Sequence, residues 1–184
     1  MIVVAVDVGI LHMAACAAEI SDQEVCGRVL ACDVLAIGQP KQPISELVDG
    51  ALRVFESRSD LFCPPGLAKV VIEQQCAMAS PKNYALAAAV YCHYVMRGVP
   101  DVKFVSPRHK FTALAAMFPS VSADDEPNLK KRSVKLAGLL AEQYPTQLSV
   151  FSLAYHSRDK KDDLSDVLGM CLTCTWQRKR KRGK

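Results

Sequence analysis

The sequence has no apolar run of the roughly 18 residues that a membrane-spanning helix needs. Its N-terminal apolar run is not preceded by basic residues and is interrupted by Asp7, which is unlike a signal peptide. No internal repeat is present, so repeat architectures are excluded. We therefore expect an intracellular protein without a membrane partner.

Metal-binding cysteine motifs are also scarce. The chain has eight cysteines but a single C-x-x-C pair, Cys171 and Cys174, with no second pair or nearby histidines to complete a four-ligand zinc site. In an intracellular protein the thiols are expected to be reduced. Cys16, Cys32, Cys92 and Cys171 lie in apolar runs, where a free cysteine behaves as a small hydrophobic residue.

The composition fits one globular domain with a short basic tail. The 184 residues are 50% hydrophobic and 23% charged, with a formal net charge of +4. Six of the 23 basic residues, and none of the 19 acidic ones, lie within residues 178–184. The rest of the chain is therefore slightly acidic. We expect a domain over residues 1–176 and a basic tail over 177–184, of a kind that typically serves nuclear targeting or contact with nucleic acid.

Hydrophobic periodicity predicts an α/β domain. Three strands separated by short turns favour an antiparallel meander, and the strands and helices that follow favour parallel crossovers. The expected strands are 2–8, 12–20, 28–37, 69–73 and 102–106, and the expected helices are 44–55, 82–97, 133–143 and one that begins near Asp162. Residues 120–133 are polar and charged, which is typical of an exposed loop.

Carboxylates interrupt three of these apolar elements. Asp7 lies near the end of the most hydrophobic strand, Glu73 follows an apolar strand, and Asp163 and Asp166 begin an amphipathic helix. A buried, unpaired carboxylate is costly, and a divalent metal removes that cost. Singly, these residues are also compatible with a turn, an exposed strand end or a helix cap, the last through Asp162.

Taken in order, the motifs resemble those of RuvC-type Holliday junction resolvases, which belong to the RNase H-like superfamily. The resemblance is strongest to the poxvirus and mitochondrial branch and spans residues 2 to about 172. It implies an RNase H-like fold, with a five-stranded mixed sheet covered by helices on both faces. The motifs are Asp-Val-Gly at 7–9, Val-Ile-Glu-Gln-Gln at 71–75, Ser-Pro at 106–107 followed by Lys110, and Lys-Lys-Asp-Asp-Leu-Ser-Asp-Val-Leu at 160–168.

The resemblance also implies the site. The family's four metal-binding acids correspond to Asp7, Glu73, Asp163 and Asp166, and Asp162 is an alternative to Asp163. Lys110 corresponds to the family's active-site lysine, and Lys103 is the alternative. We expect two divalent ions, Mg²⁺ or Mn²⁺, and no small-molecule cofactor. Two such ions about 3.5–4 Å apart can clamp the attacking and leaving oxygens of a phosphodiester.

The expected activity is structure-selective cleavage of four-way DNA junctions, in DNA recombination or the resolution of viral concatemers. A junction has two strands to cut and near two-fold symmetry, so one site per chain predicts a homodimer. The segment 82–97, with its tyrosines and few charges, is the expected interface. The expected DNA-binding cations are Lys103, Arg108, Lys130, Lys131, Arg132, Lys160 and Lys161.

Three other functions are compatible with parts of the pattern. An RNase H-like nuclease acting on RNA–DNA hybrids or other branched DNA needs the same acids. A sugar-kinase or actin-type ATPase also begins with Asp-x-Gly, but it needs a second domain and glycine-rich phosphate loops that this chain lacks. A non-catalytic nucleic-acid-binding module has no use for acids that repel phosphate. The branch favours a virus-infected cell, in its cytoplasm or nucleus, over a mitochondrion.

Overall fold

A computed structural model of the chain describes residues 1–21, 27–118 and 128–182. Five strands form one sheet in the order β3-β2-β1-β4-β5. The strands are β1 (Ile2–Asp7), β2 (Met13–Glu19), β3 (Arg28–Leu35), β4 (Leu67–Glu73) and β5 (Asp101–Val105). The first three strands pair antiparallel, and β1, β4 and β5 pair parallel. The predicted mixed sheet is thereby confirmed.

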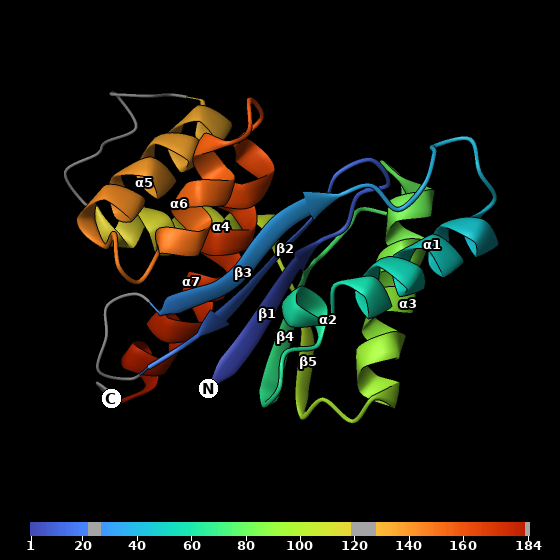
Figure 1. The fold of residues 1–184 in the computed structure, drawn as a ribbon, viewed down its shortest axis with the longest axis horizontal. Helices are drawn as coiled ribbons and strands as arrows, with labels where there is room; N and C mark the ends of the chain where they lie inside the picture. The colour runs from blue at the N-terminus through green and yellow to red at the C-terminus, as the bar shows by residue number, and fades with distance from the viewer. Residues whose placement is uncertain (22–26, 119–127, 183–184) are drawn as a thin grey trace.

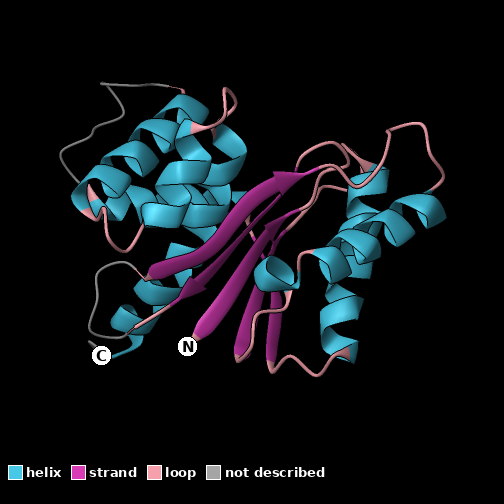
Figure 2. Cartoon of the chain, viewed as in Figure 1, coloured by secondary structure: helices cyan, strands magenta, loops and turns pink. Residues whose placement is uncertain are grey.

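Helices cover both faces of the sheet, as Figures 1 and 2 show. One layer contains α1 (Ile44–Ser57), α2 (Ser59–Phe62) and α3 (Pro81–Met96). The other contains α4 (Pro107–Met117), α5 (Leu129–Gln143), α6 (Ser149–His156) and α7 (Asp162–Arg182), so α7 continues into the segment expected to form a basic tail.

The alternation of side chains along β1 explains why the sheet is buried on both faces. Val3 and Ala5 pack in the core beneath α4–α7, whereas Val4 and Val6 pack in the core beneath α1–α3. All four are fully buried. A central strand with two covered faces needs a continuous apolar run, and this is the pattern that the sequence presents.

Several helices differ from the sequence-based expectation. The helices α2, α4 and α6 were not predicted, and α5 begins at Leu129, inside the segment 120–133 that was expected to be a loop. Residues 119–127 of that region lie outside the described part of the chain. Pro107 begins α4 and does not simply end β5, because Ser106 caps the helix by accepting a hydrogen bond from the Arg108 amide at 3.4 Å. Asn128 caps α5 in the same way.

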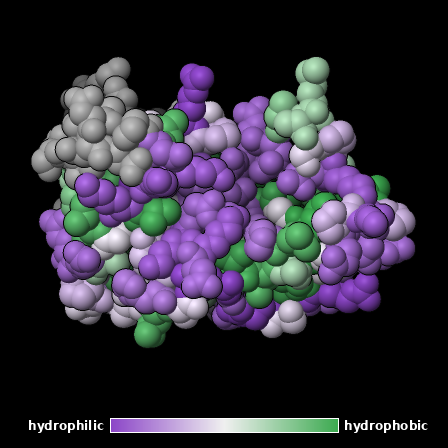
Figure 3. All heavy atoms as spheres, turned by 90° about the horizontal axis from the view of Figure 1, so that it is seen from above, coloured by the Kyte–Doolittle hydropathy of each residue, from purple (hydrophilic) through white to green (hydrophobic). Residues whose placement is uncertain are grey.

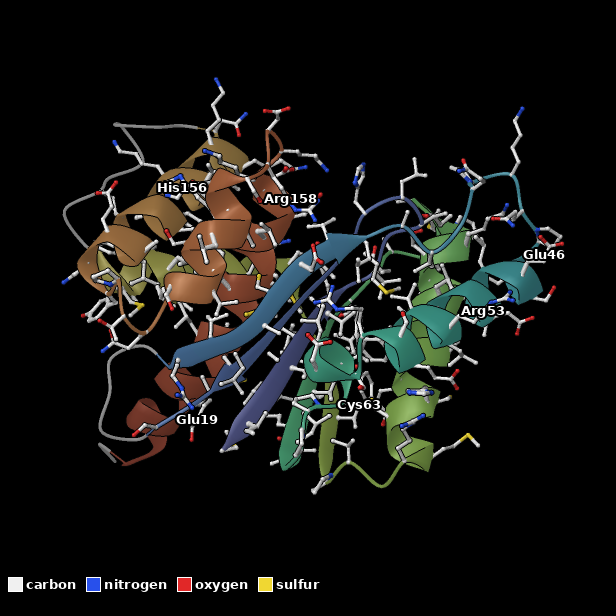
Figure 4. The ribbon with its side chains drawn as sticks, in the orientation of Figure 1. Glu19, Glu46, Arg53, Cys63, His156 and Arg158 are labelled. Carbon is white, nitrogen blue, oxygen red and sulfur yellow. The ribbon has the colours of Figure 1, made fainter. Side chains whose placement is uncertain are left out.

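An ion-pair cluster fastens the segment before α7 to the edge strand β3. The guanidinium of Arg158 binds the Asp33 carboxylate and donates to the Val34 carbonyl at 3.1 Å. Arg58 pairs with the other Asp33 oxygen at 2.7 Å. Figure 4 shows Arg158 on the side of the molecule that carries α5–α7, close to β3. This cluster fixes the chain only a few residues before the acids at the start of α7.

The cysteines are partly as expected. Cys16, Cys32 and Cys171 are buried among apolar side chains, which fits their expected role as small hydrophobic residues, and Cys174 of the C-x-x-C pair is buried beside them. Cys92 is exposed on α3, so that part of the expectation is wrong, because its position faces away from the sheet. Among the described residues, no helix is long and apolar enough to cross a bilayer.

Candidate active site

Two carboxylates meet at the carboxyl ends of the central parallel strands. Asp7 is the last residue of β1 and Glu73 is the last of β4, and the pairing of Val6 with Ile72 places them side by side. Both continue the odd-numbered series whose members Ala5 and Val71 face α4–α7. The period of the strands therefore directs both acids to the same face of the sheet.

The start of α7 supplies a third carboxylate. One carboxylate oxygen from each of Asp7, Glu73 and Asp166 lies within 4.8 Å of the others. Asp166 stands beside the buried residues Ser165 and Val167, so the helix holds it at the border of the core. The hydroxyl of Ser133 on α5 donates to Asp166 at 3.5 Å, and the Gln75 amide donates to Asp7 at 3.4 Å.

Among the residues that the structure describes, Lys110 is the lysine that contacts this cluster. The Lys110 ammonium lies 2.9 Å from a Glu73 oxygen and 2.5 Å from an Asp166 oxygen, and all three side chains are only 12–14% exposed. Gly169 makes this approach possible, because a Cβ there would lie 2.7 Å from the Lys110 carbonyl oxygen. The close packing of α4 on α7 thus delivers the lysine to the acids.

Burial and the charges of neighbouring groups both shift the pKa values in this cluster. Burial, followed by the charge of Glu73, raises the pKa of Asp7 well above its ordinary value, although Lys110 opposes this shift. Burial also raises the pKa of Asp166, again against the effect of Lys110. For Lys110, burial lowers the pKa, but the charges of Asp166, Glu73 and Asp7 outweigh it and raise the pKa overall. One ammonium thus faces three carboxylates.

This donor set fits a divalent ion. Three partly buried carboxylates supply the hard oxygen ligands that Mg²⁺ and Mn²⁺ prefer. Burial raises the pKa values of Asp7 and Asp166, and the neighbouring carboxylates add to this effect. The charge of the three carboxylates exceeds that of Lys110, and a bound divalent cation would stabilise their ionised forms.

The other predicted acids lie nearby but outside this group. Asp163 stands one helical turn before Asp166, and both of its oxygens contact the Lys160 ammonium, at 2.8 and 3.1 Å. Asp162 pairs with Lys130 at 3.3 Å. The choice between Asp163 and Asp162 as a fourth metal ligand stays a prediction.

Five of the seven predicted DNA-binding cations line two hollows. Arg108 and Lys130 line a groove of about 710 Å³ that includes Glu73, Lys110 and Asp166. A second hollow of about 360 Å³ shares Lys130 and adds three further lysines. These are Lys131, Lys160 and Lys161. Figure 3, which views the side toward which β1 and β4 end, shows a largely hydrophilic surface with one larger hydrophobic area and several smaller hydrophobic groups.

Lys103 and Arg132 do not line either hollow. Lys103, on β5, interacts with Lys69 and Asp101 and not with the acid cluster, so Lys110 is the lysine that the structure brings to the acids. Arg132 is buried, and its guanidinium lies 4.3 Å from the centre of the Phe111 ring. Its expected contact with DNA stays a prediction.

Sequence reasoning missed the polar partners of the acids. Gln75 falls within a motif that was singled out, but no role was assigned to it. Ser133 carries no local signal, because only the packing of α5 against α7 brings it to Asp166.

Comparison with solved structures identifies the class of fold. RuvC of Thermus thermophilus matches with a TM-score of 0.63 and 21% identity, over 98% of this chain and 97% of that one. The fowlpox virus resolvase, solved with substrate Holliday junction DNA, matches with a TM-score of 0.64 and 15% identity, over 96% and 98%. The yeast mitochondrial Holliday junction resolvase matches with a TM-score of 0.63 and 14% identity, over 97% of this chain and 83% of that one.

The chain therefore has the RNase H-like fold of the RuvC-type resolvases, as the sequence motifs predicted. No family model matches it. Among curated proteins, an uncharacterized protein of Acanthamoeba polyphaga mimivirus is 28% identical over 140 residues, which is 69% of this chain. The chain spans about a third of the length of that relative.

Proposed function

We propose that this chain is a metal-dependent endonuclease that cleaves four-way DNA junctions. The observation that carries the proposal is the cluster of Asp7, Glu73 and Asp166 around Lys110, at the carboxyl ends of the central strands of a resolvase-like sheet. The yeast mitochondrial and fowlpox virus relatives are named as Holliday junction resolvases, and T. thermophilus RuvC and the fowlpox virus resolvase were solved with junction DNA. This combination supports a nuclease with a branched substrate.

Each residue has a role that follows from its position. Asp7, Glu73 and Asp166, with Asp163 as the proposed fourth ligand, hold two divalent ions, Mg²⁺ or Mn²⁺. Bound metal supplies water activation and stabilises charge on the scissile phosphate. Lys110 keeps its proton because the surrounding carboxylates raise its pKa, so its ammonium can stabilise negative charge on the same phosphate.

The lysine-lined hollow beside the acids supports a path for the DNA backbone. Its four lysines outnumber its two acids, Asp159 and Asp162, and it shares Lys130 with the groove at the cluster. Phosphate contacts by these side chains would attract a junction without reading its sequence.

A homodimer is part of the proposal. The helix α3 and edge strand β5 expose a set of apolar side chains. These are Tyr84 at 51%, Val95 at 49%, Met96 at 87% and Phe104 at 41% exposure. Phe104 also stacks on Tyr91, with ring centres 5.3 Å apart, which joins helix and strand into one surface. A second copy of the chain would bury this surface and give the assembly two sites for two strands.

The biological setting is proposed as recombination or the resolution of DNA concatemers in a virus-infected cell. The match to a mimivirus protein and to the fowlpox enzyme supports a viral context.

A substrate panel tests the activity. Purified protein is incubated with a four-way junction, a flap, an RNA–DNA hybrid and linear duplex DNA, each with Mg²⁺, Mn²⁺ or EDTA. We expect paired incisions in the junction with either metal and none in EDTA. Preferential cleavage of the hybrid or flap would assign the chain to another RNase H-like activity, and no cleavage of any substrate would refute a nuclease.

A further inference from the structure

The groove beside the acid cluster is built from two kinds of surface. At one end lie Glu73, Asp166 and Lys110, and the remainder runs between α4 and α5. Apolar side chains form much of this remainder, namely Pro107, Phe111 and Leu129. At about 710 Å³, the groove falls within the range of ~300–1,000 Å³ that is typical of small-ligand sites.

The apolar part of the groove is held in place by its surroundings. Phe111 packs against the core, and the buried Arg132 guanidinium lies 4.3 Å from its ring centre. Leu129 is 59% exposed although it is apolar and begins α5. Phosphodiester chemistry makes no use of an apolar wall at the edge of a cluster of charged groups.

Cations complete the surroundings of the groove. Arg108 in the first turn of α4 and Lys130 in the first turn of α5 both line it. Lys130 is 76% exposed at its side chain, so it remains accessible to a phosphate despite its pairing with Asp162. The groove thus offers acids for metal, cations for phosphate and an apolar surface within one volume.

We propose that this groove binds an unstacked nucleobase of the strand that is cut, next to the scissile phosphate. The inference rests on the proposed function, since it takes the scissile phosphate to lie at the acid cluster. A nucleotide has chemical groups that complement the lining of the groove. Its phosphates can pair with Arg108 and Lys130. Its base can pack against the apolar side chains, which are Pro107, Phe111 and Leu129. Aromatic side chains bind unstacked bases of any sequence by stacking.

Branched DNA can supply such a base at lower cost than a continuous duplex. Removing a base from the stack costs least where pairing is already interrupted. A groove that binds an unstacked base therefore favours cleavage at or near a branch point. Phe111 and Leu129 are in this view specificity-determining residues, and the acids remain the catalytic ones.

Two variants with a matched control test the groove. Leu129→Trp fills it from an exposed position, and Phe111→Ala removes its aromatic surface. Leu153→Trp places the same indole on α6 at a residue that is 76% exposed and does not line the groove. Thermal unfolding of all three shows whether each is folded. Leu129→Trp keeps the test valid if the partly buried Phe111 cannot be replaced without loss of the fold.

The first measurement is binding of junctions that carry 2-aminopurine at single positions flanking the cut. With Asp7→Asn protein, which prevents cleavage, we expect a fluorescence increase at one position beside the scissile phosphate. Adding Leu129→Trp should abolish the increase, and adding Leu153→Trp should preserve it. Unchanged fluorescence at every flanking position, or an increase that Leu129→Trp leaves intact, overturns the inference.

The second measurement is cleavage. An abasic nucleotide at the responding position should slow cleavage by the otherwise unchanged protein at least about tenfold, and Leu129→Trp should slow cleavage of the intact junction similarly. Equal rates for Leu129→Trp and Leu153→Trp overturn the nucleobase site while the nuclease stands. Failure of the unmodified protein to cut any junction refutes the proposed function itself, and the inference with it.

Discussion

Asp7 is the residue on which the cluster depends most. It ends the central strand, faces Glu73 across the β1–β4 pair, and has the polar contact with Gln75 at 3.4 Å. Its raised pKa has burial as the main cause, so the side chain is costly to keep ionised unless a cation compensates it.

Replacing Asp7 with Asn separates chemistry from binding. The amide keeps the shape but removes one charged metal ligand, so we expect cleavage to fall at least about a thousandfold. Junction binding should change little, because the phosphate-binding cations are untouched. A nuclease assay and a gel shift on the same protein measure both, with Asp49→Asn on α1 as a control. Full activity of Asp7→Asn would refute the proposed metal site.

The same substitution predicts a pH dependence of stability in EDTA. The pKa of Asp7 is higher in the folded than in the unfolded chain, so its contribution to stability is fully present below the unfolded pKa and is lost as pH rises through the folded pKa. Asn does not ionise, so its contribution to stability does not change over this pH range. The melting temperature of Asp7→Asn minus that of the unmodified protein should therefore increase from about pH 4 to pH 8. A constant difference would show that Asp7 is not desolvated.

At the scale of elements, the packing of α4 against α7 assembles the site. Lys110 comes from the first turn of α4, and Asp166 from the start of α7. Gly169 lets the helices approach, since its missing Cβ would lie within 2.7 Å of a backbone oxygen of α4. The two helices cannot separate without moving Lys110 from the acids.

Gly169→Ala should therefore affect activity through geometry. The added methyl group must displace backbone, so we expect a loss of about 1–3 kcal/mol in the free energy of unfolding and slower cleavage as Lys110 shifts. Gly138→Ala is the matched control, because the nearest atom to its Cβ is the Tyr155 hydroxyl at 3.4 Å and alanine favours a helix. Denaturant unfolding and cleavage rates test both. Equal behaviour of the two variants would contradict the role of Gly169.

At the scale of the whole molecule, charge is divided between two neighbouring regions. The acid cluster repels phosphate, while the hollow lined by Lys130, Lys131, Lys160 and Lys161 attracts it. Bound divalent metal would reduce the repulsion and leave the basic region to orient the DNA. Binding should then be strongly salt-dependent.

Lys131→Ala tests this division. Removing one phosphate contact should lower the slope of log Kd against log salt by about 1, with no change in the preference among branched substrates. Lys41→Ala is the control, since Lys41 is exposed near the start of α1, in the other helical layer. Titrations at several salt concentrations measure the slopes. Identical slopes for the two variants would show that the lysine-lined hollow does not contact the DNA phosphates.

The proposed dimer is tested on the face formed by α3 and β5. Met96→Lys places a charge on its most exposed apolar side chain, and we expect dimer dissociation to be at least about tenfold more favourable. Sedimentation velocity measures this, with Leu153→Lys on α6 as the control. Monomers should still bind DNA but nick single strands without pairing the cuts. A dimer unaffected by Met96→Lys would place the interface elsewhere.

The sequence by itself determined the sheet, its mixed topology and the positions of Asp7 and Glu73. The sheet and the positions of these two acids follow from the local hydrophobic periodicity of the strands. Because side chains alternate between the two faces of a strand, the periodicity determines the face on which each side chain lies. It also placed Asp166 and Lys110 among the candidates through ordered motifs. Helices with weaker signals were missed. One of them is α4, whose first residues, Ser106-Pro107, were identified as a motif after the fifth strand but not as the start of a helix.

Only the tertiary structure decided which candidates meet. It brought Lys110 to the acids and left Lys103 beside Lys69, and it placed Asp163 with Lys160, outside the three-carboxylate group. It also joined Phe111 and Leu129 in one groove with Asp166. Such contacts depend on how closely helices that are far apart in the sequence pack against one another. Gly169 permits this close packing for α4 and α7, and the distance between two packed helices cannot be read from the hydrophobic periodicity of either one.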